Sequence, residues 1–245
     1  MRYLDKIHSP QDLKTLSMNQ LNHLSREIRR FMVNSVSKTG GHLASNLGVV
    51  ELSIALHYCL DSPKDRIIWD VGHQSYVHKL LTGRKDGFSD LRQLGGLSGF
   101  PKSSESPYDS FDTGHSSTSI SAAYGLAVSR DLLGADYKVV AVIGDGSLTS
   151  GLAYEGLNNV GRSKTNMIIL LNDNQMSISK NVGALSKYLN RIRITPQYND
   201  AKREIRRVLK SLPVGGIPTK RLIKKIKAQL KYMLLPGALF EEMGF

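Results

Sequence analysis

Two short polar turns, each directly after an apolar run, carry the residue types that bind a metal diphosphate. Gly144-Asp145-Gly146 follows the first run, and Asn172-Asp173-Asn174 follows the second. Glycines let a backbone turn tightly and approach a phosphate closely. A carboxylate, an amide oxygen and phosphate oxygens together suit the octahedral coordination of Mg²⁺. The two turns therefore predict a site for Mg²⁺ and a diphosphate, with Asp145 and Asn174 as metal ligands.

The elements around the turns favour this interpretation over a simple turn in which Asp145 caps a helix. The run 138–143 predicts a buried strand, 150–160 predicts a helix, and 166–171 predicts a second buried strand. Strand, helix and strand with short connections indicate a doubly wound, mostly parallel α/β sheet flanked by helices. In such sheets ligands bind at the carboxyl ends of the strands, where both turns lie. The helix from Ser150 would present its positive end to the phosphates.

Three histidines follow a glycine directly, in the pairs 41–42, 72–73 and 114–115. Each pair puts an imidazole on a turn where the backbone can approach a ligand, so all three histidines are candidate site residues. Histidine suits proton transfer because its pKa lies near neutrality. A capped turn or a satisfied polar contact is what we expect of the remaining four: His8, His23, His57 and His78.

The segments before the first turn predict further helices and a strand. Ser17-x-x-Gln20 has the form of a capping box, and apolar residues recur after it at helical spacing. The run 48–60 is apolar nearly all round, so it predicts a buried helix with Cys59 as a small buried residue. We expect a short buried strand at 66–70 and a closely packing helix at 116–133. Between them, 87–114 predicts a long irregular stretch that is functional or mobile.

Charge and composition narrow the class of protein. The chain of 245 residues has a formal net charge of +12, and most of it comes from eleven lysines or arginines and one glutamate within 202–231. The single cysteine cannot form an internal disulfide. No apolar run approaches the roughly 20 residues of a membrane helix. Because Asp5 also argues against a secretory signal, we expect a cytoplasmic protein with no membrane partner.

Several longer motifs accompany the two turns in a fixed order. Together with the turns they resemble the 1-deoxy-D-xylulose-5-phosphate synthase family, which belongs with the transketolases. The resemblance runs from Tyr3 to about Asn181 and resumes thinly at 239–245. The motifs are SKTGGHLASNLG at 37–48, WDVGHQ at 69–74, GLSGFP at 96–101 and DTGHSSTS at 112–119.

This resemblance implies a thiamine diphosphate-binding fold, with thiamine diphosphate and Mg²⁺ as cofactors. It implies a transferase that joins pyruvate to glyceraldehyde 3-phosphate with loss of CO₂, in isoprenoid and thiamine precursor synthesis. Asp145, Asn174 and the Met176 carbonyl would bind the metal, and His42 would transfer a proton near the reacting carbon. His73 would also be catalytic. The implied cofactor-binding residues are His73, Gly114, His115, Ser116, Gly146, Ser147 and Asn174.

The chain departs from that family in length, because the pyrimidine-binding and C-terminal domains have no counterpart in it. We therefore expect 1–245 to be one diphosphate-binding domain with a basic, mobile connector at about 182–238. It would hold half of a catalytic site and be inactive alone, because no glutamate in it can be assigned to activate the cofactor. We expect either a homodimer or a second chain that supplies the pyrimidine domain. A truncated synthase is favoured over a split subunit and over a degenerate binding protein.

Two other functions stay open. The N-terminal subunit of a transketolase-like enzyme would share the two turns, but we would not expect it to match 96–101 and 112–119 together. The basic segment 202–231 would suit nucleic acid or an anionic membrane. However, Tyr232 is its only neighbouring aromatic residue, and Pro213 and Pro218 break its helical pattern. We therefore expect a solvated connector and no nucleic-acid partner.

Overall fold

The computed structural model describes residues 1–163, 165–174 and 238–245. The chain divides into two compact units, Met1–Ile178 and Ser179–Phe245. In the second unit, the described residues are helix α12 (Ala238–Glu242) and those after it. Met176, the basic segment 202–231 and almost all of the predicted connector lie outside the described residues, so the predictions for them stay predictions.

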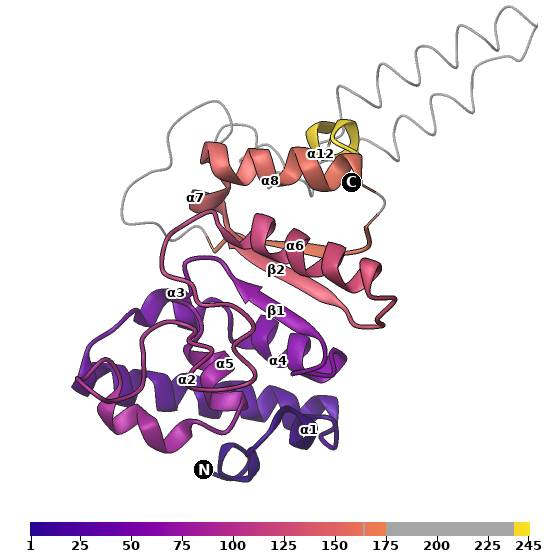
Figure 1. Cartoon of the computed structure of the whole chain (residues 1–245). Coiled ribbons are helices and arrows are strands. Elements are labelled where there is room, and N and C mark those ends of the chain that lie inside the picture. Colours follow the sequence, from indigo (N-terminus) through magenta and orange to yellow (C-terminus); the bar gives the residue numbers. More distant parts are fainter. Residues whose placement is uncertain (164, 175–237) are drawn as a thin grey trace, which may run out of the picture. The chain divides into compact units, whose positions relative to one another are not determined.

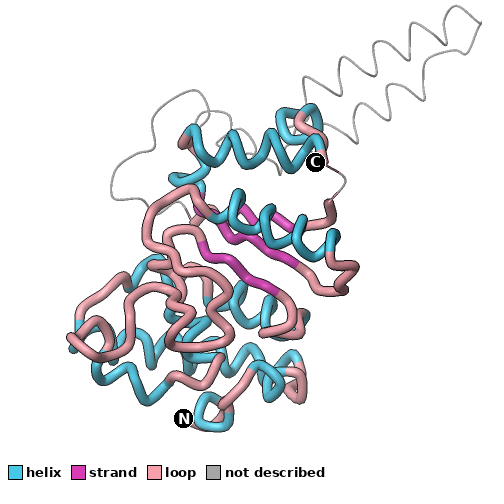
Figure 2. Tube along the Cα trace, viewed as in Figure 1, coloured by secondary structure: helices cyan, strands magenta, loops and turns pink. Residues whose placement is uncertain are grey.

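A parallel sheet organises the first unit (Figure 2). Its strands β1 (Arg66–Trp69), β2 (Val139–Gly144) and β3 (Ile168–Asn172) pair in that order, and both pairings are parallel. Gly144 lies opposite Asn172 in the register of β2 and β3. The two polar turns therefore begin side by side at the carboxyl ends of β2 and β3, which confirms the predicted parallel βαβ unit.

Helices cover both faces of this sheet (Figure 1). Successive side chains of a strand point to opposite faces. On one face Trp69 packs in a cluster with Leu56, and on the other Ile68 packs in a cluster with Ala123. The helices of the first unit are α1 (Pro10–Leu13), α2 (Met18–Thr39), α3 (Leu43–Leu47), α4 (Val50–Cys59), α5 (Tyr76–Leu81), α6 (Ser119–Leu132), α7 (Asp145–Leu148) and α8 (Gly151–Arg162), with 3-10 turns η1 (Leu4–Lys6) and η2 (Lys85–Asp90). Leu56 belongs to α4 and Ala123 to α6, so the prediction of a doubly wound sheet is confirmed.

Helix α2 begins as its sequence predicts. The Gln20 amide donates to Ser17 Oγ at 3.4 Å, and the Ser17 amide donates to Gln20 Oε1 at 2.7 Å, which together form a capping box. The buried face of α2 joins a second apolar core, which it shares with α1, α4 and α5. The α2 residues in this core are Leu21, Leu24, Ile28, Met32 and Val36.

Three burial predictions are wrong. Helix α4 is not buried all round, because only one side of it packs on the sheet and on α2, and Tyr58 on the other side is 37% exposed. Cys59 is also exposed rather than buried, because it ends the helix next to Tyr58. Strand β3 is half-exposed, with Ile168 at 44%, because β3 pairs only with β2 among the described residues and forms an edge.

The predicted irregular stretch begins later than expected. Helix α5 and η2 precede it, and neither was predicted from the sequence; α5 has only six residues, which is too short for a clear helical period. From Leu91 to Thr118 the chain has no regular helix or strand. No helix in the described ranges is long and apolar enough to cross a membrane.

Close packing of α6 on α8, expected from the small residues of 116–133, gives a first test. A Cβ added at Gly156 would lie 2.9 Å from Ile120 Cγ2, whereas one at Gly151 would meet nothing within 4 Å. Both substitutions to alanine gain helix propensity of about 1 kcal/mol at most, but overpacking costs about 1–3 kcal/mol. We expect Gly156→Ala to have a lower free energy of unfolding than Gly151→Ala, measured in urea. Equal values would contradict the close contact.

Candidate functional site

A cavity of about 170 Å³ lies where the three strands end. Asp70, His73 and Gln74 follow β1. Gly144 ends β2, and 145–147 follow it. Asn172 ends β3, and Asn174 follows it. Ala44 and Ser45 of α3 complete the wall. The carboxyl edge of the parallel sheet therefore gathers one carboxylate turn, one amide turn and one histidine into a single pocket.

Five of the predicted site residues line this cavity: His73, Asp145, Gly146, Ser147 and Asn174. The other four that the structure describes are His42, Gly114, His115 and Ser116, and they lie outside its lining. Among these, Gly114 and His115 are exposed, and a Cβ at Gly114 would meet nothing within 4 Å. Gly114 and His115 therefore have open space around them, as a ligand-facing loop requires.

The turn after β2 differs from the prediction in one respect. Helix α8 begins at Gly151 with Ser150 as its N-cap, as predicted, but the short helix α7, which was not predicted, begins at Asp145 itself and lies nearer to the turn. The first amides of a helix have no acceptor within the helix. Gly146 and Ser147 lie in that first turn and also line the cavity, so their amides suit a phosphate.

A buried aspartate fixes the loops around the cavity. Asp70 is 1% exposed, and its carboxylate accepts hydrogen bonds from the amides of Ser117 at 2.8 Å and Ser119 at 3.1 Å. Ser117 Oγ in turn donates to the Ser147 carbonyl at 2.7 Å. The end of β1, the start of α6 and the α7 turn are therefore joined. Between Asp70 and His73 the backbone is strained, because the β-branched Val71 has a φ of 59°.

Asn46 joins the turn of His42 to the turn of His73 by hydrogen bonds. Its side chain is fully buried, and Nδ2 donates to the carbonyls of His42 at 2.7 Å and His73 at 2.8 Å. Its Oδ1 accepts from the Tyr76 amide at 2.8 Å. The imidazole rings of His42 and His73 consequently lie 5.4 Å apart between centroids, although the residues are far apart in the sequence.

Both of these histidines have lowered pKa values, which favours the neutral form, although His42 is exposed and His73 only partly buried. Burial, followed by the positive charge of Arg92, lowers the pKa of His42. Burial and then His42 lower the pKa of His73, while Asp70 acts in the opposite direction. A neutral imidazole can accept a proton, which is the state that a general base requires.

Asn174 lies against the junction of α3 and α4. A Cβ added at Gly48 would lie 2.1 Å from Asn174 Nδ2, so the absence of a side chain at Gly48 makes room for this amide. The motif at 37–48 and the turn at 172–174 are therefore in direct contact. Only the tertiary structure brings them together.

The residues present fit a metal diphosphate. His73 Nδ1 and Gln74 Oε1 are buried atoms in cavity-lining residues, and neither has a hydrogen-bond partner in the described structure. Such atoms are costly to leave unpaired, which indicates that a ligand group satisfies them. Within the described ranges no group of three or more His, Cys, Asp or Glu side chains could hold a metal. One carboxylate with amide oxygens leaves the remaining positions for phosphate oxygens, as Mg²⁺ favours.

Asn46, Asp70 and Gln74 contribute to this site but were not predicted from the sequence, and neither were Ala44 and Ser45 of the cavity wall. Asp70 had a usable signal, because it is an acidic residue directly after a buried strand and before a Gly-His pair. Asn46 had none beyond its place in the motif 37–48. Its role depends on a simultaneous contact with two distant turns, which no local pattern encodes.

The lowered pKa values predict how acid affects stability. Because the folded pKa of His73 lies below its ordinary value of 6.5, the unfolded chain binds its proton first as the pH falls. The contribution of His73 to the free energy of unfolding is therefore at its full value above about pH 6.5, and it is lost as the pH falls through the folded pKa. We expect His73→Gln to flatten the fall in unfolding free energy between about pH 7.5 and 5.5, measured in urea against the wild type. Parallel curves would contradict this assignment.

Comparison with known proteins identifies the family of this chain. Residues 4–245 match the family model of 1-deoxy-D-xylulose-5-phosphate synthase. The synthase of Syntrophomonas wolfei is 60% identical over 242 residues, which are 99% of this chain and 38% of that protein. The synthase of Alkaliphilus oremlandii is 58% identical over the whole chain, which spans 39% of it. The chain thus spans under two-fifths of the length of these relatives.

Solved structures support the fold independently. A transketolase variant from Pichia stipitis matches with a TM-score of 0.59 at 22% identity, covering 70% of this chain and 30% of that one. A transketolase of the same organism in complex with sedoheptulose 7-phosphate matches with a TM-score of 0.54, covering 65% and 29%. These likenesses show a thiamine diphosphate-binding fold. With the family model matching nearly every residue, the chain belongs to the 1-deoxy-D-xylulose-5-phosphate synthase family, of which it represents the N-terminal part.

Proposed function

We propose that this chain binds the diphosphate of thiamine diphosphate through Mg²⁺ and forms half of the active site of a 1-deoxy-D-xylulose-5-phosphate synthase. The observation that carries the proposal is the cavity at the strand ends, which Asp145, Asn174 and His73 line together. Asp145 and Asn174 supply metal ligands, and the Met176 carbonyl supplies a third. The cofactor is the group that makes the family's reaction possible, because it acts as an electron sink when pyruvate loses CO₂.

The residues of the chain bind, orient and move protons around that group. The amides of Gly146 and Ser147 and the ring of His73 bind the phosphates, while Gly114, His115 and Ser116 line the rest of the cofactor. His42 accepts or returns a proton near the reacting carbon, because its lowered pKa keeps it neutral. The substrates are pyruvate and glyceraldehyde 3-phosphate. The cytoplasm remains our prediction for where this occurs.

By itself the 245-residue chain turns over these substrates negligibly. No glutamate lines the described cavity, and Glu51 is held by Arg29 on the surface. The group that activates the cofactor comes from outside these 245 residues, for example from a second chain. A transketolase-like subunit is the alternative, and identities near 60% with the synthases favour the synthase. A rate with pyruvate and the aldehyde close to that of a full-length synthase would overturn the proposal of inactivity.

Removing the predicted metal ligand tests the site. Substitutions that only orient a ligand cost about 10–100-fold in metal affinity, so loss of the ligand itself should cost at least as much. We expect Asp145→Ala to weaken Mg²⁺-dependent binding of thiamine diphosphate on the order of a hundredfold or more, measured by titration calorimetry. Asp136→Ala, at an exposed position before β2, is the control and should bind like the wild type. Equal affinities in both variants would reject Asp145 as a ligand.

The contact between Gly48 and Asn174 gives a second test of the same site. An alanine at Gly48 would displace the Asn174 amide, so we expect Gly48→Ala to weaken Mg²⁺-dependent binding by about tenfold. Gly125→Ala is the matched control, because a Cβ at Gly125 in α6 meets nothing within 4 Å. If Gly48→Ala binds as tightly as Gly125→Ala, Asn174 does not hold the metal from this position.

A further inference from the structure

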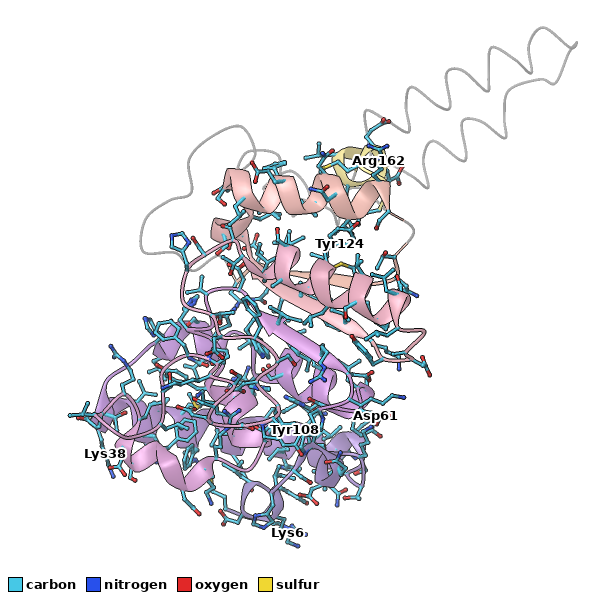
Figure 3. All side chains as sticks on the ribbon, viewed as in Figure 1. Lys6, Lys38, Asp61, Tyr108, Tyr124 and Arg162 are labelled. Carbon is cyan, nitrogen blue, oxygen red and sulfur yellow. The ribbon has the colours of Figure 1, made fainter. Side chains whose placement is uncertain are left out.

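A second set of ionisable side chains lies apart from the cavity, and none of its members lines it. We call it the Asp109 cluster. His78, Lys79 and Asp109 have fully buried side chains, Arg84 is 12% exposed and Glu105 is 19% exposed. His57, also fully buried, completes the cluster. The cluster joins α4 and α5 to the irregular stretch after η2, where Tyr108, labelled in Figure 3, marks the segment between Glu105 and Asp109.

Asp109 is the centre of the cluster. Its Oδ1 accepts from His78 Nε2 at 2.8 Å and from Arg84 Nη2 at 2.8 Å, and its Oδ2 accepts from Arg84 Nη1 at 2.7 Å. Oδ2 also accepts from the amide of Lys102 at 2.8 Å, within its own loop. These bonds hold the pKa of Asp109 below its ordinary value despite its burial. One carboxylate therefore ties the loop to itself and to α5 at the same time.

Glu105, four residues before Asp109, also binds both a cation of α5 and a backbone amide of the loop. Its Oε2 accepts from Lys79 Nζ at 2.5 Å, and its Oε1 accepts from the amide of Ser98 at 2.7 Å. The loop has no ladder or helix to fix its path, so its two carboxylates supply that function. Each carboxylate pairs a buried cation with a backbone amide of the loop.

The histidines of the cluster fix one another's tautomer. Because Asp109 accepts from His78 Nε2, that nitrogen carries the proton, and His78 Nδ1 is left to accept. His57 Nε2 lies 2.8 Å from His78 Nδ1 and must therefore be the donor. Burial lowers the pKa of both rings, so both are neutral. His57 of α4 thus sets the orientation in which His78 holds Asp109.

The loop held in this way lies against the turns that carry the candidate site residues. A Cβ at Gly72 would lie 2.3 Å from Pro101 Cδ and 2.4 Å from Thr113 Oγ1, so the loop packs on the turn directly before His73. The ring of Phe100 lies 6.3 Å from that of His42. The loop then continues without a break into Gly114–Ser116. Its path therefore sets the positions of three candidate site segments.

Burial of these charges is poorly explained by stability alone. Buried ion pairs cost desolvation free energy, and apolar residues of similar volume often stabilise a protein equally well. Buried polar groups in other systems specify one geometry among several. An irregular loop beside a catalytic pocket is a place where such specification has a use.

We propose that Asp109 and Glu105 are positioning residues. They fix the loop 97–113 and thereby keep the turns of His42, His73 and Gly114 in constant positions relative to one another beside the cavity. This proposal rests on the proposed function for its consequence in cofactor binding, but the fixed loop path does not depend on it. Neither residue lines the cavity. Loss of either should loosen the loop first and weaken the site through it.

The test compares Asp109→Asn and Glu105→Gln with Asp65→Asn in the 245-residue chain. Asp65 is the matched control, because it is 3% exposed and its carboxylate also accepts two backbone amides, of Asp61 and Lys138, away from the cavity. Hydrogen exchange by mass spectrometry should speed up by about tenfold or more in 97–116 for the first two variants. Asp65→Asn should leave that segment unchanged. Unchanged exchange in Glu105→Gln, or equal exchange in Asp65→Asn, would overturn the proposal.

A spectroscopic readout separates positioning from general destabilisation. Because Phe100 lies beside His42, movement of the loop should shift the imidazole NMR signals of His42 and His73 in Asp109→Asn, and Asp65→Asn should leave them in place. Unshifted signals alongside faster exchange would also overturn the positioning role. If Asp109→Asn does not fold, Glu105→Gln carries both readouts.

Cofactor binding distinguishes this proposal from the function on which it rests. If the wild type binds thiamine diphosphate and Mg²⁺, Asp109→Asn should weaken that binding by about tenfold while Asp65→Asn binds as the wild type does. Equal affinity in Asp109→Asn would overturn the link to the site. If the wild type binds no cofactor, the proposed function fails, and exchange and NMR still decide whether the loop is held by Asp109.

Discussion

The parallel alignment of β1, β2 and β3 is the constraint on which the rest of the site depends. Parallel strands are connected by crossovers, so successive strands end at the same edge of the sheet. Asp70, Asp145 and Asn174 belong to three separate strand ends and line one cavity for this reason. The register that sets Gly144 opposite Asn172 then brings the carboxylate turn level with the amide turn.

Buried polar side chains refine what the sheet provides. Asp70 joins the end of β1 to the start of α6, and Asn46 joins the turns of His42 and His73. Each of them saturates backbone groups that an irregular loop would otherwise leave unpaired in the interior. The site is therefore supported by hydrogen bonds to backbone, which hold loops in one conformation, while the apolar clusters on both faces hold the strands.

Burial also sets the chemistry of the histidines. His42 and His73 lie close together with lowered pKa values, so neither carries a positive charge into the other's surroundings near neutral pH. His57 and His78 also lie close together, but both are fully buried and hydrogen-bonded to each other, and they serve Asp109 instead of the cavity. Two histidine pairs of similar composition thus differ in role because one reaches the strand ends and the other does not.

The sequence by itself determined the strands, the parallel βαβ unit, the capping box of α2 and the two ligand turns, because all of these depend on local periodicity and on glycine and polar residue types. It also identified His73, Asp145, Gly146, Ser147 and Asn174 as residues of one site. Only the tertiary structure decided that Cys59 and parts of strand β3 are exposed, since exposure depends on which neighbours cover an apolar residue. It alone revealed the hydrogen-bond partners of Asn46, Asp70 and Asp109, because those partners lie on segments that meet only after the chain has folded.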